Sequence, residues 1–259
     1  MKFTVLQSNS KGNGYLLHND HECLILECGV PLKEVKKALN FKMDLVVGAV
    51  VSHRHSDHAK YIDEYLKAGI PVYSNEDTIN KATDKSLTHK LKAQKKYKIG
   101  GFTIIPIDAN HDVPCFSYAI IHEDIGAALF AIDTSYIKAI VEGLDYLFIE
   151  CNYAEDILEQ NVNDGKVTFA QMTRLQQTHM ELEQTIQEAV QCKEHSDNLK
   201  FIVLLHLSDN NSNEDQFIST VEQATGIPTQ AARKGDILDM LYAPTLSTAD
   251  TIGFSGDRP

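Results

Sequence analysis

The segment AVVSHRHSDHAK, residues 49–60, places three histidines and one aspartate within six positions, directly after an apolar run. In shuffled chains of this composition, the pattern His-x-His-x-Asp-His is expected about one time in a thousand. His53 and His55 lie two residues apart, so in an extended chain their side chains project to the same side. Asp57 and His58 follow a turn and can face a second centre beside the first. Imidazole together with carboxylate suits zinc, or manganese where oxygen ligands dominate, so the segment predicts a metal site.

The composition is that of an ordinary soluble globular protein. The chain of 259 residues can bury a full core, and its residues are 43% hydrophobic and 23% charged. No stretch approaches the roughly 18 consecutive apolar residues of a membrane span, and the apolar segment at the start is too short for a secretory signal. The five cysteines have no CxxC spacing, which indicates buried thiols in a reducing compartment. A cytoplasmic location without a membrane partner is expected.

The charge is unevenly distributed along the chain. A net charge of −12 disfavours broad, nonspecific binding to nucleic acid. Residues 81–98 nevertheless hold seven of the 24 basic residues and a single acid, Asp84. Two interpretations of this Lys-rich segment stay open: a solvated helix or loop face, or an arm that attracts phosphates to an otherwise acidic body.

Short apolar runs separated by turn signals predict strands with helices between them. The predicted strands span 3–6, 15–17, 23–26, 45–51, 102–107, 118–121, 128–132, 146–149 and 201–205. The predicted helices span 32–39, 60–68 and 179–192. Thr178 and Glu181 have the spacing of a capping box, which would place His179 in the first turn of the last helix. Together these elements predict one α/β domain over residues 1–242, followed by a flexible tail at 243–259 that is rich in small and polar residues.

Several predicted strands lead to a residue that can bind a metal or transfer a proton. These residues are His53, His111, Asp133, Glu150 and His206. Any one of them could simply cap a turn. Strand ends that carry such residues at one edge of a sheet form a site, because polar groups gather where the core opens to solvent. Five such ends together with the histidine cluster therefore indicate a single site.

The order of these residues resembles the five-motif pattern of the metallo-β-lactamase superfamily. Within that superfamily, residues 1–240 resemble the small WalJ-type exonucleases and, more distantly, ribonuclease Z. Four shorter segments carry the closer likeness: NSKGN at 9–13, NHDVP at 110–114, IECNY at 149–153 and HLSDNN at 206–211. Two positions depart from the usual pattern, since Glu27-Cys28-Gly29 stands where Asp-x-Gly is usual and Ser135 stands where glycine is common.

The resemblance implies an αββα sandwich, in which two mixed sheets lie face to face with helices outside and two divalent metal ions at one end. Zinc is the expected metal, with manganese as the alternative. The implied ligands of the first ion are His53, His55 and His111. The implied ligands of the second ion are Asp57, His58 and His206, and Asp133 bridges both. A bridging carboxylate makes physical sense, because two dications about 3.5–4 Å apart need anionic screening.

Histidine ligands also need acceptors that fix the tautomer, and Asp112 and Ser208, beside His111 and His206, are the local candidates. The resemblance to ribonuclease Z implies that Glu150 and His179 supply the proton for the leaving oxygen, and Asp57 completes the predicted catalytic set. The motif loops give the candidate substrate-binding residues, which are Ser10, Lys11, Asn13 and Asn210.

The favoured function is a dinuclear metal-dependent phosphodiesterase, and specifically a nuclease on single-stranded or end-accessible DNA that acts through a metal-activated hydroxide. Two alternatives stay open. One is a hydrolase of small or cyclic nucleotides, and the other is a hydrolase of a non-phosphate ester, lactone or thioester. The expected partner is therefore a nucleic acid or nucleotide, and a homodimer is compatible with the sequence.

Overall fold

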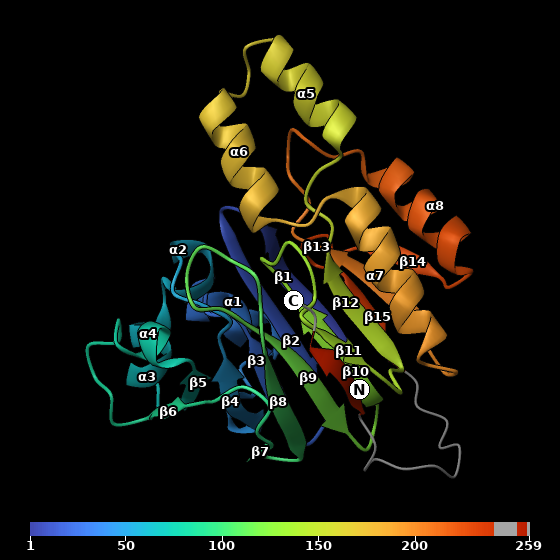
Figure 1. Cartoon of the computed structure of the whole chain (residues 1–259). Helices are drawn as coiled ribbons and strands as arrows, with labels where there is room; N and C mark the ends of the chain where they lie inside the picture. The colour runs from blue at the N-terminus through green and yellow to red at the C-terminus, as the bar shows by residue number, and fades with distance from the viewer. Residues whose placement is uncertain (241–252, 258–259) are drawn as a thin grey trace.

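Two seven-stranded sheets pack face to face in the computed structural model, and helices cover both outer faces (Figure 1). The structure describes residues 1–240 and 253–257. Sheet one contains, in spatial order, β15 (Ile237–Asp239), β1 (Lys2–Asn9), β2 (Gly12–His18), β3 (Cys23–Leu26), β4 (Val46–Val50), β5 (Val72–Ser74) and β6 (Thr88–Lys90). Sheet two contains β14 (Thr229–Ala231), β13 (Phe201–Leu205), β12 (Tyr146–Glu150), β10 (Gly126–Ala131), β9 (Phe116–His122), β8 (Phe102–Asp108) and β7 (Tyr97–Ile99).

Both sheets mix parallel and antiparallel pairs. In sheet one, β15 and β1 to β3 pair antiparallel, whereas β3 to β6 pair parallel. In sheet two, β7 to β10 pair antiparallel, whereas β10, β12, β13 and β14 pair parallel. The parallel strands of each sheet end on the same side, so the loops that follow them meet at one end of the sandwich.

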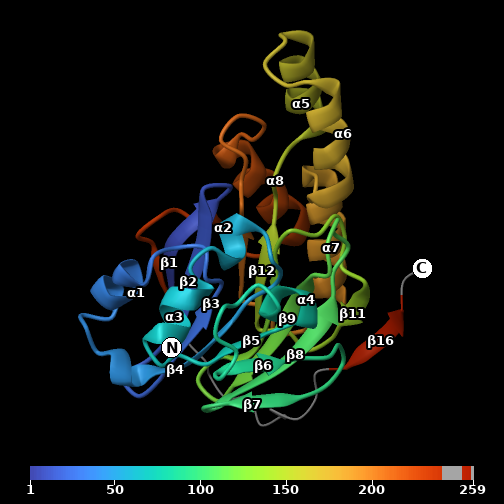
Figure 2. The same cartoon turned by 90° about the vertical axis from the view of Figure 1, so that its left-hand side faces the viewer.

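The helices form the two outer layers. Sheet one carries α1 (Leu32–Ala38), a 3₁₀ turn (Met43–Leu45), α2 (Ser56–Ala59), α3 (Ile62–Lys67) and α4 (Glu76–Ile79). The second half of the chain supplies α5 (Glu155–Asn163), α6 (Phe169–Thr178), α7 (Leu182–Glu194) and α8 (Glu214–Thr225). Of these, α7 and α8 pack on sheet two, while α5 and α6 project beyond the ends of the sheets (Figure 2). None of the described helices is long and apolar enough to cross a membrane.

Aromatic side chains fill the space between the sheets. The Phe3 ring stacks on Phe148 with ring centroids 4.3 Å apart, and on Tyr15 at 5.5 Å. These rings are fully buried, and such pairs stabilise a core beyond the burial of their apolar area. Phe3 and Val5, two residues apart on β1, both belong to this core, whereas Leu6 packs in the core on the other face of sheet one.

The predicted αββα sandwich is confirmed, and all nine predicted strands are present. The three-residue strands were not predicted, because they are too short for alternation to show in the sequence. Helix α6 was not predicted either: its one buried residue is Thr178, and a helix without an apolar core face has little periodic pattern. The predicted helix at 60–68 is present as α3, and a separate short helix that was not predicted, α2, precedes it and begins inside the histidine motif at Ser56.

The predicted capping box at residues 178–181 is wrong. Thr178 is the last residue of α6, and its hydroxyl donates to the carbonyl of Arg174 within that helix. Glu181 is itself the N-cap of α7, where its carboxylate accepts from backbone N–H groups of the first turn. His179 lies between the two helices in extended backbone, with φ −127° and ψ 159°.

The predicted tail is only partly described. Residues 254–257 form β16 (Phe254–Asp257), which pairs antiparallel with β11 (Ala139–Val141), where the sequence predicted a flexible segment. Backbone pairing with a short partner strand leaves no trace in composition. Residues 243–252 and 258–259 of that prediction lie outside the described residues, and the domain boundary at 242 stays a prediction. All five cysteines are buried and free, as predicted.

Gly29 is expected to be essential because backbone passes directly beside it. A Cβ at Gly29 would lie 1.7 Å from the Asp57 carbonyl oxygen and 2.7 Å from the Asn13 nitrogen. Gly29→Ala should therefore displace α2 and lower the free energy of unfolding by about 1–3 kcal/mol. Chemical denaturation measures this loss, with Lys60→Ala on the exposed end of α2 as the control. Equal denaturation midpoints for Gly29→Ala and Lys60→Ala would contradict the close approach of backbone to Gly29.

Candidate metal centre and active site

Histidine and aspartate side chains gather in two adjoining clusters at one end of the sandwich. The first cluster contains His53, His55, His111 and Asp133. The second cluster contains Asp57, His58, Asp133 and His206. Within each cluster the candidate ligand atoms all lie within 4.8 Å of one another, and Asp133 belongs to both. The structure thus brings together all seven residues that the sequence proposed as ligands, in the two groups expected.

The ends of the parallel strands position these side chains. His53 and His55 follow β4, Asp133 follows β10 and His206 follows β13. Asp133 and His206 have left-handed backbone, with φ of 48° and 54°. Residues other than glycine rarely adopt this conformation, and where they do the surrounding structure holds them, often at functional sites. The chain therefore turns sharply at both residues as it leaves the sheet.

Three buried atoms in the clusters suit a metal ion. His53 Nε2, Asp133 Oδ1 and His206 Nε2 are buried and have no hydrogen-bond partner. Such unpaired polar atoms are uncommon, because each forfeits its hydrogen bonds to water. Imidazole nitrogen and carboxylate oxygen are the ligands that zinc binds. The donor set and the orphaned atoms are therefore consistent with a dinuclear metal site.

The opposite ring nitrogens of two histidines are held by neighbouring groups. His111 Nδ1 donates to the Thr178 carbonyl at 3.0 Å, which orients the ring so that Nε2 faces the first cluster. His53 Nδ1 lies 2.9 Å from the Ser52 hydroxyl, and its Nε2 points toward Asp133 at 3.6 Å. Both rings are thereby oriented before any ligand arrives.

Glu150 and His179 form a tight pair beside the clusters. His179 Nδ1 lies 2.6 Å from Glu150 Oε1, and the other oxygen of Glu150 accepts from the Thr134 backbone N–H at 2.9 Å. Burial would raise the pKa of Glu150, but the charges of His179 and His206 outweigh burial and hold that pKa below its usual value. Burial would likewise lower the pKa of His179, but Glu150 outweighs it and raises that pKa. The pair therefore favours a carboxylate and a protonated imidazole.

A cavity of about 430 Å³ opens over the clusters. His55, Asp57, Asp133 and His206 line its floor together with His179, whose side chain is 15% exposed. A substrate in this cavity would meet candidate metal ligands and His179 at once. The volume lies in the range of small-molecule sites.

Comparison with known proteins identifies the family. Residues 32–206 match the model of the beta-lactamase superfamily domain. The chain belongs to the metallo-β-lactamase superfamily. With its His/Asp clusters, it is a metal-dependent hydrolase of that superfamily.

Individual relatives are more distant. The exodeoxyribonuclease WalJ of Streptococcus pneumoniae is 26% identical over 173 residues, which cover 61% of this chain and 64% of WalJ. The crystal structure of YhfI from Bacillus subtilis, a metallo-beta-lactamase fold protein, superimposes with a TM-score of 0.70 at 20% identity, covering 92% of this chain and 98% of YhfI. Human tRNase Z, short form, superimposes with a TM-score of 0.65 at 13% identity, and the match covers 93% of this chain and 100% of tRNase Z. At these identities the solved structures show a shared fold alone.

Glu27, which replaces the aspartate usual in this superfamily, still supports a candidate ligand. Its buried carboxylate accepts from the Ser52 backbone N–H at 3.1 Å and lies 3.3 Å from His58 Nδ1. Burial raises the pKa of Glu27, although His58 and Ser52 act in the opposite direction. The longer side chain starts from left-handed backbone at φ 69°. Although glutamate stands in place of aspartate at position 27, a carboxylate still lies beside His58.

The expected orienting role of Ser208 is wrong, whereas Asp112 does lie beside a ring nitrogen of His111. The Ser208 hydroxyl accepts from Asn211, which lies in its own turn, and His206 Nδ1 instead faces Glu150 Oε1 at 3.2 Å. Asp112 Oδ1 lies 3.2 Å from His111 Nε2, the nitrogen on the cluster side, whereas the Thr178 carbonyl holds Nδ1. Adjacency in sequence is misleading only for Ser208, whose hydroxyl is bonded within its own turn.

The predicted substrate-binding residues are spread over different surroundings. Ser10 lines the cavity. Lys11 is exposed and pairs with Asp209 at 3.1 Å, while Asn210 is exposed and its carbonyl accepts from Asn161. Asn13 is buried, with Nδ2 3.0 Å from His58 Nε2. A role of these four residues in substrate binding stays a prediction.

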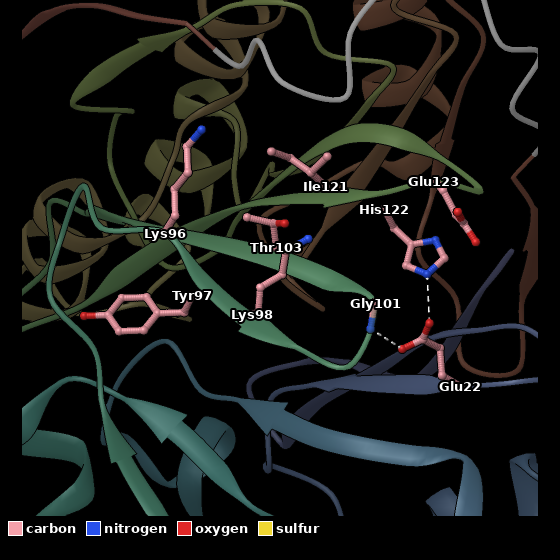
Figure 3. Close-up of a pocket in the computed structure, with 9 residues that line it drawn as sticks. All are labelled: Glu22, Lys96, Tyr97, Lys98, Gly101, Thr103, Ile121, His122 and Glu123. Carbon is pink, nitrogen blue, oxygen red and sulfur yellow. Dashed lines mark hydrogen bonds and ion pairs between the residues drawn. The ribbon is translucent and has the colours of Figure 1, made fainter.

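A second cavity, of about 460 Å³, lies at the opposite end of sheet two, beside the start of β8 (Figure 3). His122 Nδ1 accepts from the Asp124 backbone N–H, so Nε2 carries the proton and donates to Glu22 Oε1 at 3.0 Å. Glu22 also accepts from the Gly101 backbone N–H at 2.7 Å. These bonds tie the β2–β3 turn of sheet one to sheet two. Among the described residues no metal-ligand cluster lies in this cavity.

Asp133→Ala should remove the carboxylate that both clusters share. We expect metal affinity to fall by more than about 100-fold and hydrolysis to be lost, while the sheets stay folded. Metal analysis of the purified variant measures the first effect and circular dichroism the second. Asp63→Ala, which removes a carboxylate from α3, is the control. Two metal ions per chain and near-normal turnover in Asp133→Ala would show that the clusters are not the active site.

Proposed function

We propose that this protein is a phosphodiesterase that cleaves DNA with single-stranded or accessible ends. The observation that carries the proposal is the Glu150–His179 pair, which lies at hydrogen-bond distance and opens onto the cavity above both clusters. A relative named as an exodeoxyribonuclease, which matches 61% of the chain, supports the choice of DNA.

The proposed metal ligands are those of the two clusters, with zinc as the expected metal and manganese as the alternative. When bound, two divalent ions lower the pKa of a water molecule and stabilise charge that develops on a phosphoryl oxygen. Asp57 and Asp133 would balance the charge of the ions. The histidines of the clusters are already oriented by Ser52, Thr178 and Glu27.

His179 would supply the proton that the leaving oxygen needs. Its Nδ1 is engaged by Glu150, which leaves Nε2 as the ring atom available to a substrate. Glu150 stabilises the protonated ring, and the raised pKa of His179 keeps the acid form present near neutral pH. A sugar alkoxide is a poor leaving group and requires this proton.

A hydrolase of small or cyclic nucleotides is the second candidate function. The cavity of about 430 Å³ is of a size that takes one nucleotide. Incubation of the metal-loaded protein with end-labelled single- and double-stranded DNA, RNA, cyclic nucleotides and bis(p-nitrophenyl) phosphate separates the candidates. Cleavage of a lactone or thioester, with every phosphodiester intact, would replace both by a carbon-ester hydrolase.

His179→Ala should cost about 10²–10⁴-fold in kcat on a natural phosphodiester. The loss should be far smaller on a p-nitrophenyl ester, because p-nitrophenolate leaves without a proton. Kinetics on both substrates, with metal analysis, measure the difference. His195→Ala, an exposed histidine at the end of α7, is the matched control. Equal losses on both substrates would indicate a structural role for His179, and loss of metal would make it a ligand.

The Lys-rich segment 81–98 would guide the polyanion toward the site. It contains loops with two short strands, β6 and β7, and its lysines are exposed, although Lys90 pairs with Glu76 at 2.6 Å. It connects the edge strands of the two sheets along the side of β8, where the Gln94 N–H donates to the Pro106 carbonyl.

Replacing Lys92, Lys95 and Lys96 by Gln should weaken binding of single-stranded DNA. The slope of log K against log salt should fall by about 2, because each phosphate that a lysine neutralises on a single strand adds roughly 0.7 to the slope. Turnover of a small phosphodiester should stay unchanged. Fluorescence anisotropy at several salt concentrations measures the slope, with Lys33, Lys42 and Lys67 replaced by Gln as the charge-matched control. The same slope in both triple variants would favour the solvated-face interpretation.

A further inference from the structure

Helix α6 stands over the active-site cavity with little packing of its own. Figures 1 and 2 both show α5 and α6 projecting past the ends of the sheets. Thr178, at its last position, is the buried residue of α6, and Phe169 at its first position is 75% exposed. The helix is anchored at that last turn, where the Thr178 carbonyl accepts from His111 and His179 bonds to Glu150.

One face of α6 lines the cavity. The residues that do so are Gln171, Arg174, Leu175 and Thr178. Their spacing of i, i+3, i+4 and i+7 defines a single helix face. In an ordinary globular helix this face would cover the core, whereas here it faces the space above the metal clusters. The face is therefore available to a substrate.

Arg174 is the only lysine or arginine among the described residues that line this cavity. Its guanidinium lies 3.8 Å from Asp112 Oδ2, and the two side chains are 66% and 38% exposed. An exposed pair at this distance contributes little to stability, so Arg174 can exchange Asp112 for another anion at low cost. A guanidinium presents donors that match two phosphate oxygens.

The position of Asp112 indicates which phosphate Arg174 meets. Asp112 Oδ1 lies 3.2 Å from His111 Nε2 and 3.4 Å from His55 Nε2, while Oδ2 faces Arg174. Arg174 therefore lies on the far side of the Asp112 carboxylate from His111 Nε2, the nitrogen that faces the first cluster and His55 Nδ1. If a phosphate were held at the clusters for cleavage, the next phosphate along the strand would lie closer to Arg174.

We propose, resting on the proposed function, that α6 is a substrate-binding arm in which Arg174 binds the phosphate adjacent to the scissile one. Leu175, half-buried on the same face, offers apolar surface to the sugar or base between the two phosphates. Arg174 is thus a positioning residue that selects oligonucleotides over substrates with one phosphodiester.

The test compares a dinucleoside monophosphate with a trinucleotide that has two phosphodiesters. Arg174→Ala should lose about 10–100-fold in kcat/KM on the trinucleotide, mainly through KM, and less than about 3-fold on the dinucleotide. Arg174→Lys should recover part of the loss, because lysine restores the positive charge but not the paired N–H donors of the guanidinium. Lys166→Ala, which removes a charge from the α5–α6 connection outside the cavity, should match the wild type.

Neutral methylphosphonate linkages test the contact from the substrate side. Two trinucleotide isomers, each with one linkage neutral, cover both polarities of digestion. In one of the two isomers the scissile linkage is native and the adjacent linkage is neutral. Wild type should cleave that isomer about 10–100-fold less efficiently than the native trinucleotide. For Arg174→Ala the cleavage efficiencies of these two substrates should differ less than about 3-fold. Metal content and circular dichroism should be the same for all variants.

The outcomes separate the inference from the proposed function. If wild type cleaves no nucleotide phosphodiester, the proposed function fails and this inference fails with it. If wild type cleaves both substrates but Arg174→Ala loses equally on both, or on neither, the proposed function stands and the role of Arg174 is overturned. Undiminished discrimination against methylphosphonate in Arg174→Ala overturns it as well.

Discussion

The buried carboxylate of Asp133 is the interaction on which the rest of the site depends. Burial alone would raise its pKa, but the His58 and His206 rings beside it outweigh burial and hold that pKa well below its usual value. One charge thus sets the arrangement of rings on both sides, with His58 Nε2 at 3.1 Å and His206 Nδ1 at 3.3 Å. Since an unpaired buried charge is costly, the two clusters form together around Asp133.

Thr178 connects helix α6 to the candidate active site. Its carbonyl accepts from His111, its hydroxyl closes the last turn of α6, and the next residue along the chain is His179. The end of α6, the proposed proton donor and the carbonyl that holds a candidate metal ligand therefore lie in one short stretch of backbone. Movement of α6 would displace His179 and the Thr178 carbonyl that holds His111, because both belong to the end of that helix.

The sequence predicted the parts of the site that are local. His53, His55, Asp57 and His58 are visible because one turn and its flanks hold them all, and His206 is visible because a buried strand leads directly to it. Contacts made by folding were not predictable in this way. The carboxylate of Glu27, which follows β3, contacts His58 on α2, and nothing in the sequence around either residue indicates that contact. The wrong capping box has the same physical origin. Thr178 and Glu181 have the right spacing for a capping box, but the Thr178 hydroxyl is bonded inside α6, a helix that the apolar pattern does not reveal.

Arg174 could not be singled out from the sequence either. Exposed arginines are common, and the significance of this one depends on where α6 projects.

The connection between β6 and β7 has a consequence for association between copies of the chain. An exposed sheet edge presents unpaired backbone groups that another strand can pair with, and lysines on such an edge oppose that pairing. Here one lysine-rich segment forms the edges of both sheets on the same side of the sandwich. The opposite edge of sheet one ends in β15, whose Ile237 is 59% exposed. The two sides of the sandwich are therefore unequal: strand-to-strand self-association is opposed by charge along β6 and β7, and a second copy would meet less repulsion along β15.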